Sequence, residues 1–315
     1  MKCVFLDTTS LDDLDLRPLE TQFDQFVTYP VTLPDQVQDR IAGFDVVITN
    51  KVVLSADVIA QAQDLKLICV VATGVNNVDL EAAKQSNIAV YNCQAYGTDA
   101  VAQHVIMLML LLHTRFLSYR QDVQQGAWQQ ASQFCLLDYP ILELKGRKLG
   151  ILGYGALGQR VGQLAEAFGM QVLIASRPGA QPVEGRVPLN DLLAQVDVLS
   201  LHCPLTPETQ NVIDKEALAC MQPGSFLVNA ARGGIVNEEA LADALRSGHL
   251  AGAATDVLTE EPPRHGNILL DASIPNLIVT PHNAWGSRQA RQTIVQQTAD
   301  NIHSWLEAKD LRRIV

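Results

Sequence analysis

The stretch of residues 149–169 reads LGILGYGALGQRVGQLAEAFG. Its apolar run ends at Gly153, and Gly155 and Gly158 follow in the spacing G-x-G-x-x-G. Apolar residues then repeat at helical spacing, at Leu157, Val161, Leu164 and Phe168. A strand, a glycine turn and a helix in this order let a backbone approach a pyrophosphate, which the N–H groups of the helix N-terminus attract. The stretch therefore predicts a dinucleotide-binding turn.

Short apolar runs alternate with helical patterns on both sides of this turn. Before it, the expected strands are KCVFLD (2–7), FDVVITN (44–50), LKLICVVATG (65–74) and IAVYNC (88–93). From the turn onward they are KLGILG (148–153), QVLIAS (171–176), VDVLSLHC (196–203), SFLVNAA (225–231), AGAATDV (251–257) and NLIVTPH (276–282). Such runs are typical of parallel strands covered by helices on both faces. We expect an α/β fold with two parallel-sheet lobes.

The segments between and after the two series of strands predict the domain boundaries. Residues 99–117 are apolar nearly all round, which predicts a long buried helix, and residues 119–146 predict an irregular arm. Residues 287–308 have helical spacing and are expected to pack on the first lobe. We therefore expect one domain of residues 1–98 plus 287–315 and a second, inserted domain of residues 99–286. The buried helix favours a homodimer.

Composition excludes several classes of protein. The net charge of −11 argues against nucleic-acid and anionic-membrane partners, which need a basic surface. The N-terminus lacks the pattern of a signal peptide, and the longest apolar run, Val105–Leu112, is too short to span a bilayer. The cysteines stand singly and the histidines lack ligand spacing, so no metal site is expected. A cytoplasmic protein is the expectation.

Polar residues of particular types follow three successive expected strands. Arg232 follows SFLVN, Asp256 and then Glu261 follow AGAAT, and His282 follows NLIVTP. Each alone is compatible with a surface arginine, a solvated acid or a loop histidine. Together they fall at the carboxyl ends of strands, where open α/β sheets bind ligands. These residue types suit redox chemistry on a hydroxy or keto acid.

Four motifs together resemble a known family. The glycine turn, NAARGGIVNEEAL (229–241), AATDVLTEEPP (253–263) and TPHNAW (280–285) are similar to the D-isomer-specific 2-hydroxyacid dehydrogenases, in order along the chain. GVNNVDLEAAK (74–84), YGTDAVAQH (96–104), SLHCPLTPET (200–209) and Trp285 resemble most the glycerate dehydrogenase and hydroxypyruvate or glyoxylate reductase branch. The resemblance implies a Rossmann dinucleotide-binding domain inserted into a flavodoxin-like substrate domain. It implies hydride transfer between NAD(P)H and a small 2-oxo acid.

The resemblance also implies roles for the polar residues. Arg232 would hold the carboxylate and carbonyl of the substrate, a task suited to the planar guanidinium. His282 would protonate the carbonyl oxygen as the hydride arrives, and Glu261 would pair with the imidazole and favour its charged form. Asp256 would help to place the nicotinamide ring.

Further binding residues follow from the same resemblance. The backbone N–H groups of Gly74, Val75 and Asn76 would bind the substrate carboxylate. Lys51 would face the substrate, with a solvated lysine as the alternative, and Trp285 would close the pocket, with core packing as the alternative. The expected cofactor contacts are Thr98, Gly153, Tyr154, Gly155, Ala156, Leu157, Gly158, Ser176, Arg177, His202, Cys203, Pro204, Thr206, Ala230, Ala231, Arg232, Asp256 and His282.

Ser176 occupies the position that predicts the choice of cofactor. NAD-using relatives carry an acid there that accepts hydrogen bonds from the ribose hydroxyls, and this chain does not. The absence of a carboxylate removes a repulsion against a 2′-phosphate, and Arg177 is a candidate clamp for that phosphate. Glu184 is an alternative partner for the ribose. We expect NADPH to be favoured over NADH.

Two other functions remain open from the sequence. One is a nucleotide-sensing binding protein of the corepressor type on the same fold, against which the presence of Arg232, Glu261 and His282 together argues. The other is a dehydrogenase of D-lactate type.

Overall fold

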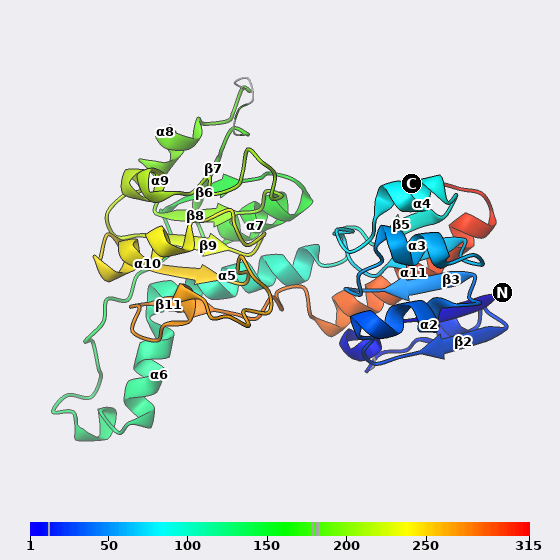
Figure 1. Cartoon of the computed structure of the whole chain (residues 1–315). Helices are drawn as coiled ribbons and strands as arrows, with labels where there is room; N and C mark the ends of the chain where they lie inside the picture. Colours follow the sequence, from blue (N-terminus) through cyan, green and yellow to red (C-terminus); the bar gives the residue numbers. More distant parts are fainter. Residues whose placement is uncertain (12, 178, 180–182) are drawn as a thin grey trace. The chain divides into compact units, whose positions relative to one another are not determined.

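The computed structural model describes residues 1–11, 13–177, 179 and 183–315. The chain folds into two compact units (Figure 1). Unit 1 comprises Met1–Gly97 and Gly286–Val315, and unit 2 comprises Thr98–Trp285. Each boundary falls one residue before the boundary expected from the sequence.

Unit 1 contains a five-stranded sheet in which all neighbours are parallel. Its strands are β1 (Lys2–Phe5), β2 (Gln25–Thr28), β3 (Val46–Thr49), β4 (Leu67–Val70) and β5 (Ala89–Asn92). The spatial order β2-β1-β3-β4-β5 is the flavodoxin-like order. The sequence did not predict β2, because this edge strand is only half-buried and lacks a continuous apolar run.

Helices cover both faces of this sheet. They are α1 (Arg17–Glu20), α2 (Val37–Ile41), α3 (Ala56–Gln61), α4 (Leu80–Gln85) and α11 (Arg288–Leu306), with short 3₁₀ turns η1 (Thr8–Ser10) and η2 (Pro34–Gln36). The helices α2, α3 and α4 share an apolar core with the sheet, whereas α11 lies against β4, β5 and α1. The side chains of Ser55, Asp79 and Ser287 cap α3, α4 and α11.

Unit 2 contains a six-stranded parallel sheet in the order β11-β10-β9-β8-β6-β7. Its strands are β6 (Lys148–Leu152), β7 (Gln171–Ile174), β8 (Val198–Leu201), β9 (Ser225–Asn229), β10 (Leu250–Thr255) and β11 (Leu277–Val279). Beyond β7, Val187 forms a single parallel bridge with Ala175. With this bridge counted as a short third strand, the order is that of a Rossmann sheet, and the order reverses between β6 and β8.

Helices also cover both faces of the second sheet (Figure 1). They are α5 (Thr98–Thr114), α6 (Phe116–Gln124), α7 (Ala156–Ala167), α8 (Leu189–Leu193), α9 (Lys215–Cys220) and α10 (Glu238–Arg246), with 3₁₀ turns η3 (Trp128–Gln130) and η4 (Ile268–Leu270). One core packs α5 and α7 on the sheet, and the other packs α8, α9 and α10. The expected α/β class with two parallel sheets is confirmed.

The expected buried helix and irregular arm are present, but the bounds expected for them, residues 99–117 and 119–146, are wrong. Arg115 adopts a left-handed backbone conformation (φ 51°) and separates α5 from α6, which runs through to Gln124. No single described helix is long and apolar enough to cross a membrane. Among the residues that the structure describes, only α5 and α6 taken together reach that length and composition, and they are bent by 62°.

Candidate active site

The glycine turn after β6 has the close contacts that its sequence requires. Gly153 has φ +97°, and a Cβ atom there would lie 2.4 Å from the backbone nitrogen of Cys203. A Cβ atom at Gly158 would lie 2.2 Å from the carbonyl oxygen of Gly153. The turn therefore packs on the segment after β8 and on itself, with no room for a side chain at either position.

The middle glycine of the motif differs from the other two. A Cβ atom at Gly155 would meet nothing within 4 Å, and the backbone there is extended in a way that any residue adopts. Gly155 is also the N-cap residue of α7, and no side chain caps that helix end. The space beside Gly155 and the N–H groups of the α7 N-terminus fit the pyrophosphate of a dinucleotide. Tyr154, Ala156 and Leu157 complete this turn.

The segment after β8 forms the adjoining wall at the point where the strand order reverses. The imidazole Nε2 of His202 lies 2.9 Å from the hydroxyl oxygen of Ser200, and its Nδ1 has no hydrogen-bond partner among the described residues. Burial lowers the pKa of His202 to about 4, so the ring is neutral at pH 7. Burial also raises the pKa of the Cys203 thiol to about 11. This thiol is protonated at neutral pH and is a poor nucleophile.

Hydrogen bonds fix the rest of this wall. The hydroxyl group of Thr209, which is buried, donates to the carbonyl oxygen of Pro204 over 2.7 Å and accepts from the amide of Thr206 over 2.7 Å. Thr209 was not predicted from the sequence, where it is one of two threonines that follow Pro204. Of the remaining expected contacts, Thr98 begins α5, and Ala230 and Ala231 follow β9.

Ser176 and Arg177 lie directly beyond β7, as the fingerprint requires. The amide of Ser176 donates to the carbonyl oxygen of Val187, and the amide of Val187 donates to that of Ile174, each over 2.8 Å. Ser176 is half-buried and Arg177 is exposed. The sheet therefore fixes the backbone at Ser176, while the guanidinium of Arg177 reaches solvent.

Arg232 lies in a turn that Asn229 stabilises at the end of β9. The side chain of Asn229 accepts from the amide of Ala231 over 3.1 Å and donates to the carbonyl oxygen of Arg232 over 3.0 Å. The guanidinium donates to the carbonyl oxygen of Ala231 over 2.6 Å and is otherwise exposed. Asn229 therefore holds the backbone that carries this cation.

Glu261 and His282 form a hydrogen-bonded pair between the loops that follow β10 and β11. The imidazole Nδ1 lies 2.5 Å from one carboxylate oxygen of Glu261, and the amide of Leu258 donates to the other over 2.8 Å. Burial raises the pKa of Glu261, but these two hydrogen bonds and the charges of His282 and Arg232 outweigh it, so the pKa is lowered. Glu261 is therefore a carboxylate at neutral pH and accepts the hydrogen bond from the imidazole.

Asp256 holds the loop that carries His282. The carboxylate is 2% exposed and accepts from the hydroxyl of Thr280 over 2.5 Å and from the amides of Asn283 and Ala284 over 3.0 and 2.9 Å. The imidazole Nε2 of His104 in turn lies 3.1 Å from the hydroxyl oxygen of Thr280. The sequence did not predict Thr280 or His104 in this network.

His282 itself has a left-handed backbone, with φ 51°. Its amide donates to the carbonyl oxygen of Thr280, and its own carbonyl oxygen accepts the indole N–H of Trp285, each over 3.0 Å. A residue other than glycine is strained in this conformation, so the surrounding hydrogen bonds must hold it. Trp285 is half-buried and supplies one of them.

Unit 1 brings its own expected residues together at the carboxyl edge of its sheet. Asp7, after β1, accepts from the amides of Asn50 and Lys51 over 2.8 and 2.6 Å. Burial raises the pKa of Asp7, and these amide bonds oppose that shift. The side chain of Asn77 donates to the carbonyl oxygen of Val52 over 2.9 Å, so the loop containing Lys51 adjoins the following one. That following loop contains Gly74, Val75 and Asn76.

No three His, Cys, Asp or Glu side chains are grouped to hold a metal ion within the described ranges. In unit 2, the structure gathers the glycine turn and its wall after β6 and β8, and Arg232, Asp256, Glu261 and His282 after β9, β10 and β11. Lys51 and residues 74–76 belong to the other unit. Unit 2 thus presents a dinucleotide-type turn beside a cation and an acid–base pair.

Comparisons with known proteins agree with this chemistry. Residues 106–284 match the family described as "D-isomer specific 2-hydroxyacid dehydrogenase, NAD binding domain". A glycerate dehydrogenase of Methylorubrum extorquens is 43% identical over 308 residues, which cover 98% of this chain and 97% of that protein. A hydroxypyruvate reductase of Blautia hydrogenotrophica is 38% identical over 98% of this chain and 97% of that protein.

A solved structure extends the likeness to both units. An acyclic imino acid reductase in complex with NADPH and D-Arg has a TM-score of 0.87 and 25% identity, and the match covers 100% of both chains. The resemblance stated from the motifs is therefore confirmed. This chain belongs to the D-isomer specific 2-hydroxyacid dehydrogenase family and is an NAD(P)-dependent oxidoreductase.

Proposed function

We propose that this enzyme reduces hydroxypyruvate and glyoxylate to D-glycerate and glycolate, with NADPH as the preferred reductant. The observation that carries the proposal is the hydrogen-bonded pair of His282 and Glu261, in which the imidazole Nδ1 lies 2.5 Å from a carboxylate oxygen. This pair and Arg232 lie at the carboxyl edge of the same sheet. A cation for the carboxylate and an acid for the carbonyl oxygen are what the reduction of a 2-oxo acid needs.

The proposed steps follow from these side chains. The bound dinucleotide supplies the hydride. Arg232 donates its guanidinium N–H groups to the carboxylate and carbonyl of the substrate, and so orients the carbonyl carbon. His282 donates a proton from Nε2, since Nδ1 faces Glu261, and the carbonyl oxygen becomes a hydroxyl. Glu261 stabilises the imidazolium before that transfer and holds the ring afterwards.

Unit 1 carries the other residues that the family resemblance links to the substrate. The backbone N–H groups of Gly74, Val75 and Asn76 are proposed to bind the carboxylate, since this loop lies at the ligand-binding edge of a parallel sheet. The side chain of Asn92 donates to the carbonyl oxygen of Thr73 over 2.7 Å and so holds the start of this loop. Lys51, whose backbone is fixed by Asp7, is proposed to add a positive charge.

The preference for NADPH rests on Ser176 and Arg177. Ser176 lies at the end of β7 where a carboxylate would accept hydrogen bonds from the ribose and repel a 2′-phosphate. The exposed guanidinium of Arg177 follows it directly. The NADPH complex of the acyclic imino acid reductase shows that a protein of this fold binds the phosphorylated dinucleotide.

Steady-state kinetics test the proposal. NADH and NADPH are each measured against hydroxypyruvate, glyoxylate and pyruvate. We expect the largest kcat/KM with NADPH and hydroxypyruvate, followed by glyoxylate. A larger kcat/KM with pyruvate would assign a D-lactate-type specificity instead. Nucleotide binding without turnover of any 2-oxo acid would favour the nucleotide-sensing protein.

We further propose that the enzyme is a homodimer that buries the segment around α6. This segment leaves the body of unit 2 (Figure 1) and exposes a series of large apolar side chains, at Phe116, Leu117, Val123, Trp128, Phe134, Leu137 and Ile141. Phe134 is 90% exposed. Exposed apolar patches of this kind mark protein interfaces. Sedimentation should give a dimer, and Phe134→Asp combined with Leu137→Asp should give a monomer; a monomeric wild type rejects this part.

A further inference from the structure

The carboxylate of Glu238 joins two loops of the proposed active site. Glu238 is the first residue of α10, on the segment that follows Arg232. One oxygen accepts from the amide of Thr259 over 2.7 Å, and the other accepts from the side-chain amide of Asn267 over 2.7 Å. Thr259 and Asn267 lie on either side of Glu261. Glu238 therefore fixes both ends of the loop that carries the partner of His282.

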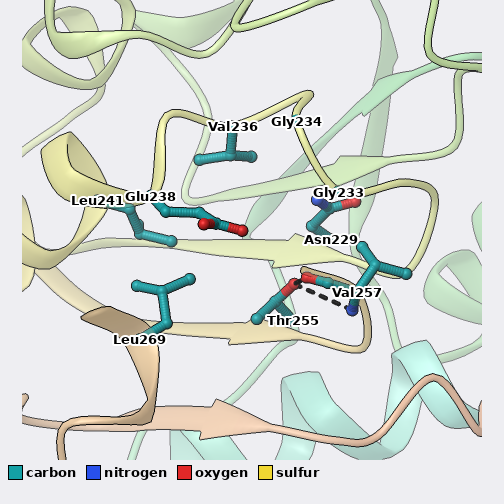
Figure 2. A pocket seen from close by; sticks show the side chains of 9 residues that line it. All are labelled: Asn229, Gly233, Gly234, Val236, Glu238, Leu241, Thr255, Val257 and Leu269. Carbon is teal, nitrogen blue, oxygen red and sulfur yellow. Dashed lines mark hydrogen bonds between the residues drawn. The ribbon is translucent and has the colours of Figure 1, made fainter. Parts of the chain in front are cut away.

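The side chain of Glu238 is half-buried, whereas Thr259, one of its two partners, is exposed. Glu238 lines a small cavity of about 10 Å³ together with Asn229, Thr255 and Val257, and Figure 2 shows its carboxylate reaching from the start of α10 into this space. A space of this size is close to the smallest that holds one water molecule. A half-buried carboxylate at such a place needs its hydrogen bonds, because an unpaired one is costly.

The backbones of the same two loops are also in contact. A Cβ atom at Gly233 would lie 1.9 Å from the carbonyl oxygen of Leu258. The amide of Leu258 donates to Glu261. The turn that carries Arg232 therefore contacts Leu258, whose amide holds one oxygen of Glu261. The hydrogen bonds of Glu238 join the same two loops a few residues later in the sequence.

A simpler role does not account for this arrangement. An acidic residue in the first turn of a helix is stabilised by the helix dipole, and Glu239 serves that role equally well from an exposed position. The N-cap of α10 is the side chain of Asn237, which accepts from the amide of Ala240. Helix formation thus needs neither oxygen of Glu238, and both bond to the Glu261 loop.

We propose that Glu238 is a positioning residue that keeps the Glu261–His282 pair correctly placed relative to Arg232. The proposal rests on the acid–base role given above to Glu261 and His282. Glu238 touches neither of them directly. It acts through Thr259 and Asn267, whose positions set where the loop places Glu261.

A reciprocal exchange tests this role. In Glu238→Gln the side-chain oxygen still accepts from Thr259, but the new NH₂ group faces the NH₂ group of Asn267, and two donors meet. Adding Asn267→Asp restores one donor and one acceptor, and the new carboxylate keeps the oxygen that accepts from the amide of Leu269. Glu239→Gln is the matched control, because it removes the same charge from the same helix turn.

The measurements are kcat, KM, the dinucleotide Kd, and the pH at which reductase activity falls to half. We expect Glu238→Gln to lower kcat on the order of 10- to 100-fold, since small misplacements of catalytic groups have effects of this size. The half-activity pH should move to lower values, because a misplaced Glu261 stabilises the charged imidazole less. The Kd should stay within twofold. The double variant should regain most of the kcat, and Glu239→Gln should match the wild type.

Three outcomes distinguish failure of this proposal from failure of the proposed function. Glu261→Gln is measured in the same assay. If Glu261→Gln alters kcat and the pH profile while Glu238→Gln alters neither, or lowers only the unfolding temperature, Glu238 has no positioning role. If the exchange with Asn267→Asp gives no recovery in a folded protein, the pairing is rejected as well. If Glu261→Gln itself changes neither quantity, the acid–base assignment falls, and the role of Glu238 falls with it.

Discussion

The indole N–H of Trp285 donates a hydrogen bond to the carbonyl oxygen of His282, over 3.0 Å. His282 is held in a left-handed backbone conformation, which is unfavourable for any residue with a Cβ atom. The bond therefore contributes to the orientation of the proposed acid. A tryptophan that only closed the pocket over a substrate would have no need of this partner.

Trp285→Phe separates the two roles of this side chain. The variant keeps an aromatic ring and removes the donor, and a hydrogen bond of this kind contributes about 1 kcal/mol. We expect kcat to fall about fivefold with little change in KM, measured by steady-state kinetics. A rise in KM at unchanged kcat would instead assign Trp285 to substrate contact alone.

His282→Gln should abolish most turnover while the dinucleotide still binds. General acid catalysis contributes roughly 10²- to 10⁴-fold, and a glutamine cannot donate the proton as an acid. Stopped-flow turnover and fluorescence titration with NADPH measure the two properties separately. Equal losses of turnover and of dinucleotide affinity would show that His282 serves the fold of the loop rather than proton transfer.

Two glycines of the same turn should respond in opposite ways to a side chain. A Cβ atom at Gly155 enters open space, so Gly155→Val should leave the unfolding temperature unchanged. The branched side chain would occupy the space beside the α7 N-terminus, and the dinucleotide Kd should therefore rise more than about tenfold. Gly153→Ala meets the backbone of Cys203 at positive φ, and should destabilise the fold by on the order of 2 kcal/mol. Thermal unfolding and fluorescence titration of both variants test this contrast, which fails if Gly155→Val binds dinucleotide normally.

Ser176→Asp should shift cofactor preference toward NADH. A carboxylate near the 2′-phosphate repels it by up to about 4 kcal/mol at close range with an effective dielectric near 20. The ratio of kcat/KM for NADPH to that for NADH should fall by at least about tenfold. Arg177→Gln is the companion variant, and it should weaken the binding of NADPH but not that of NADH. If neither substitution moves the ratio, a different side chain, with Glu184 the first candidate, reads the ribose.

The parts of the fold that follow from local pattern were predictable from the sequence. Each apolar run that was expected to form a strand did so, because a strand buried on both faces needs apolar side chains at every position. The edge strand Gln25–Thr28 has no such run, since half of it faces solvent. The break at Arg115 was also hidden, because a left-handed arginine depends on what packs around it and not on its own preference.

The residues of the candidate site also fall into two groups, those that the sequence predicts and those that it does not. Arg232, Glu261 and His282 were predictable, because their chemical types recur after successive strands within recognisable motifs. Glu238 was not, since an acid at the start of a helix is explained by the helix alone. Thr280 and His104 are far apart in the sequence and meet only in the folded unit. Residues that position the reactive groups thus depend on tertiary contacts that no spacing records.

The buried imidazole of His113 should make the free energy of unfolding depend on pH. His113 is 1% exposed, stacks on Phe226, and has a pKa that burial lowers to about 4 from 6.5. Between these values the unfolded chain binds a proton that the folded chain does not, so the free energy of unfolding falls as the pH falls from 6.5 toward 4. The loss amounts to about 3 kcal/mol over the whole window.

His113→Leu removes this group, so the unfolding temperature of the variant should fall less than that of the wild type between pH 7 and pH 4, as measured by calorimetry. His202, whose pKa is also lowered to about 4, remains in both proteins and cancels in the comparison. Parallel losses of stability in the two proteins would show that His113 takes up its proton equally well in the folded state.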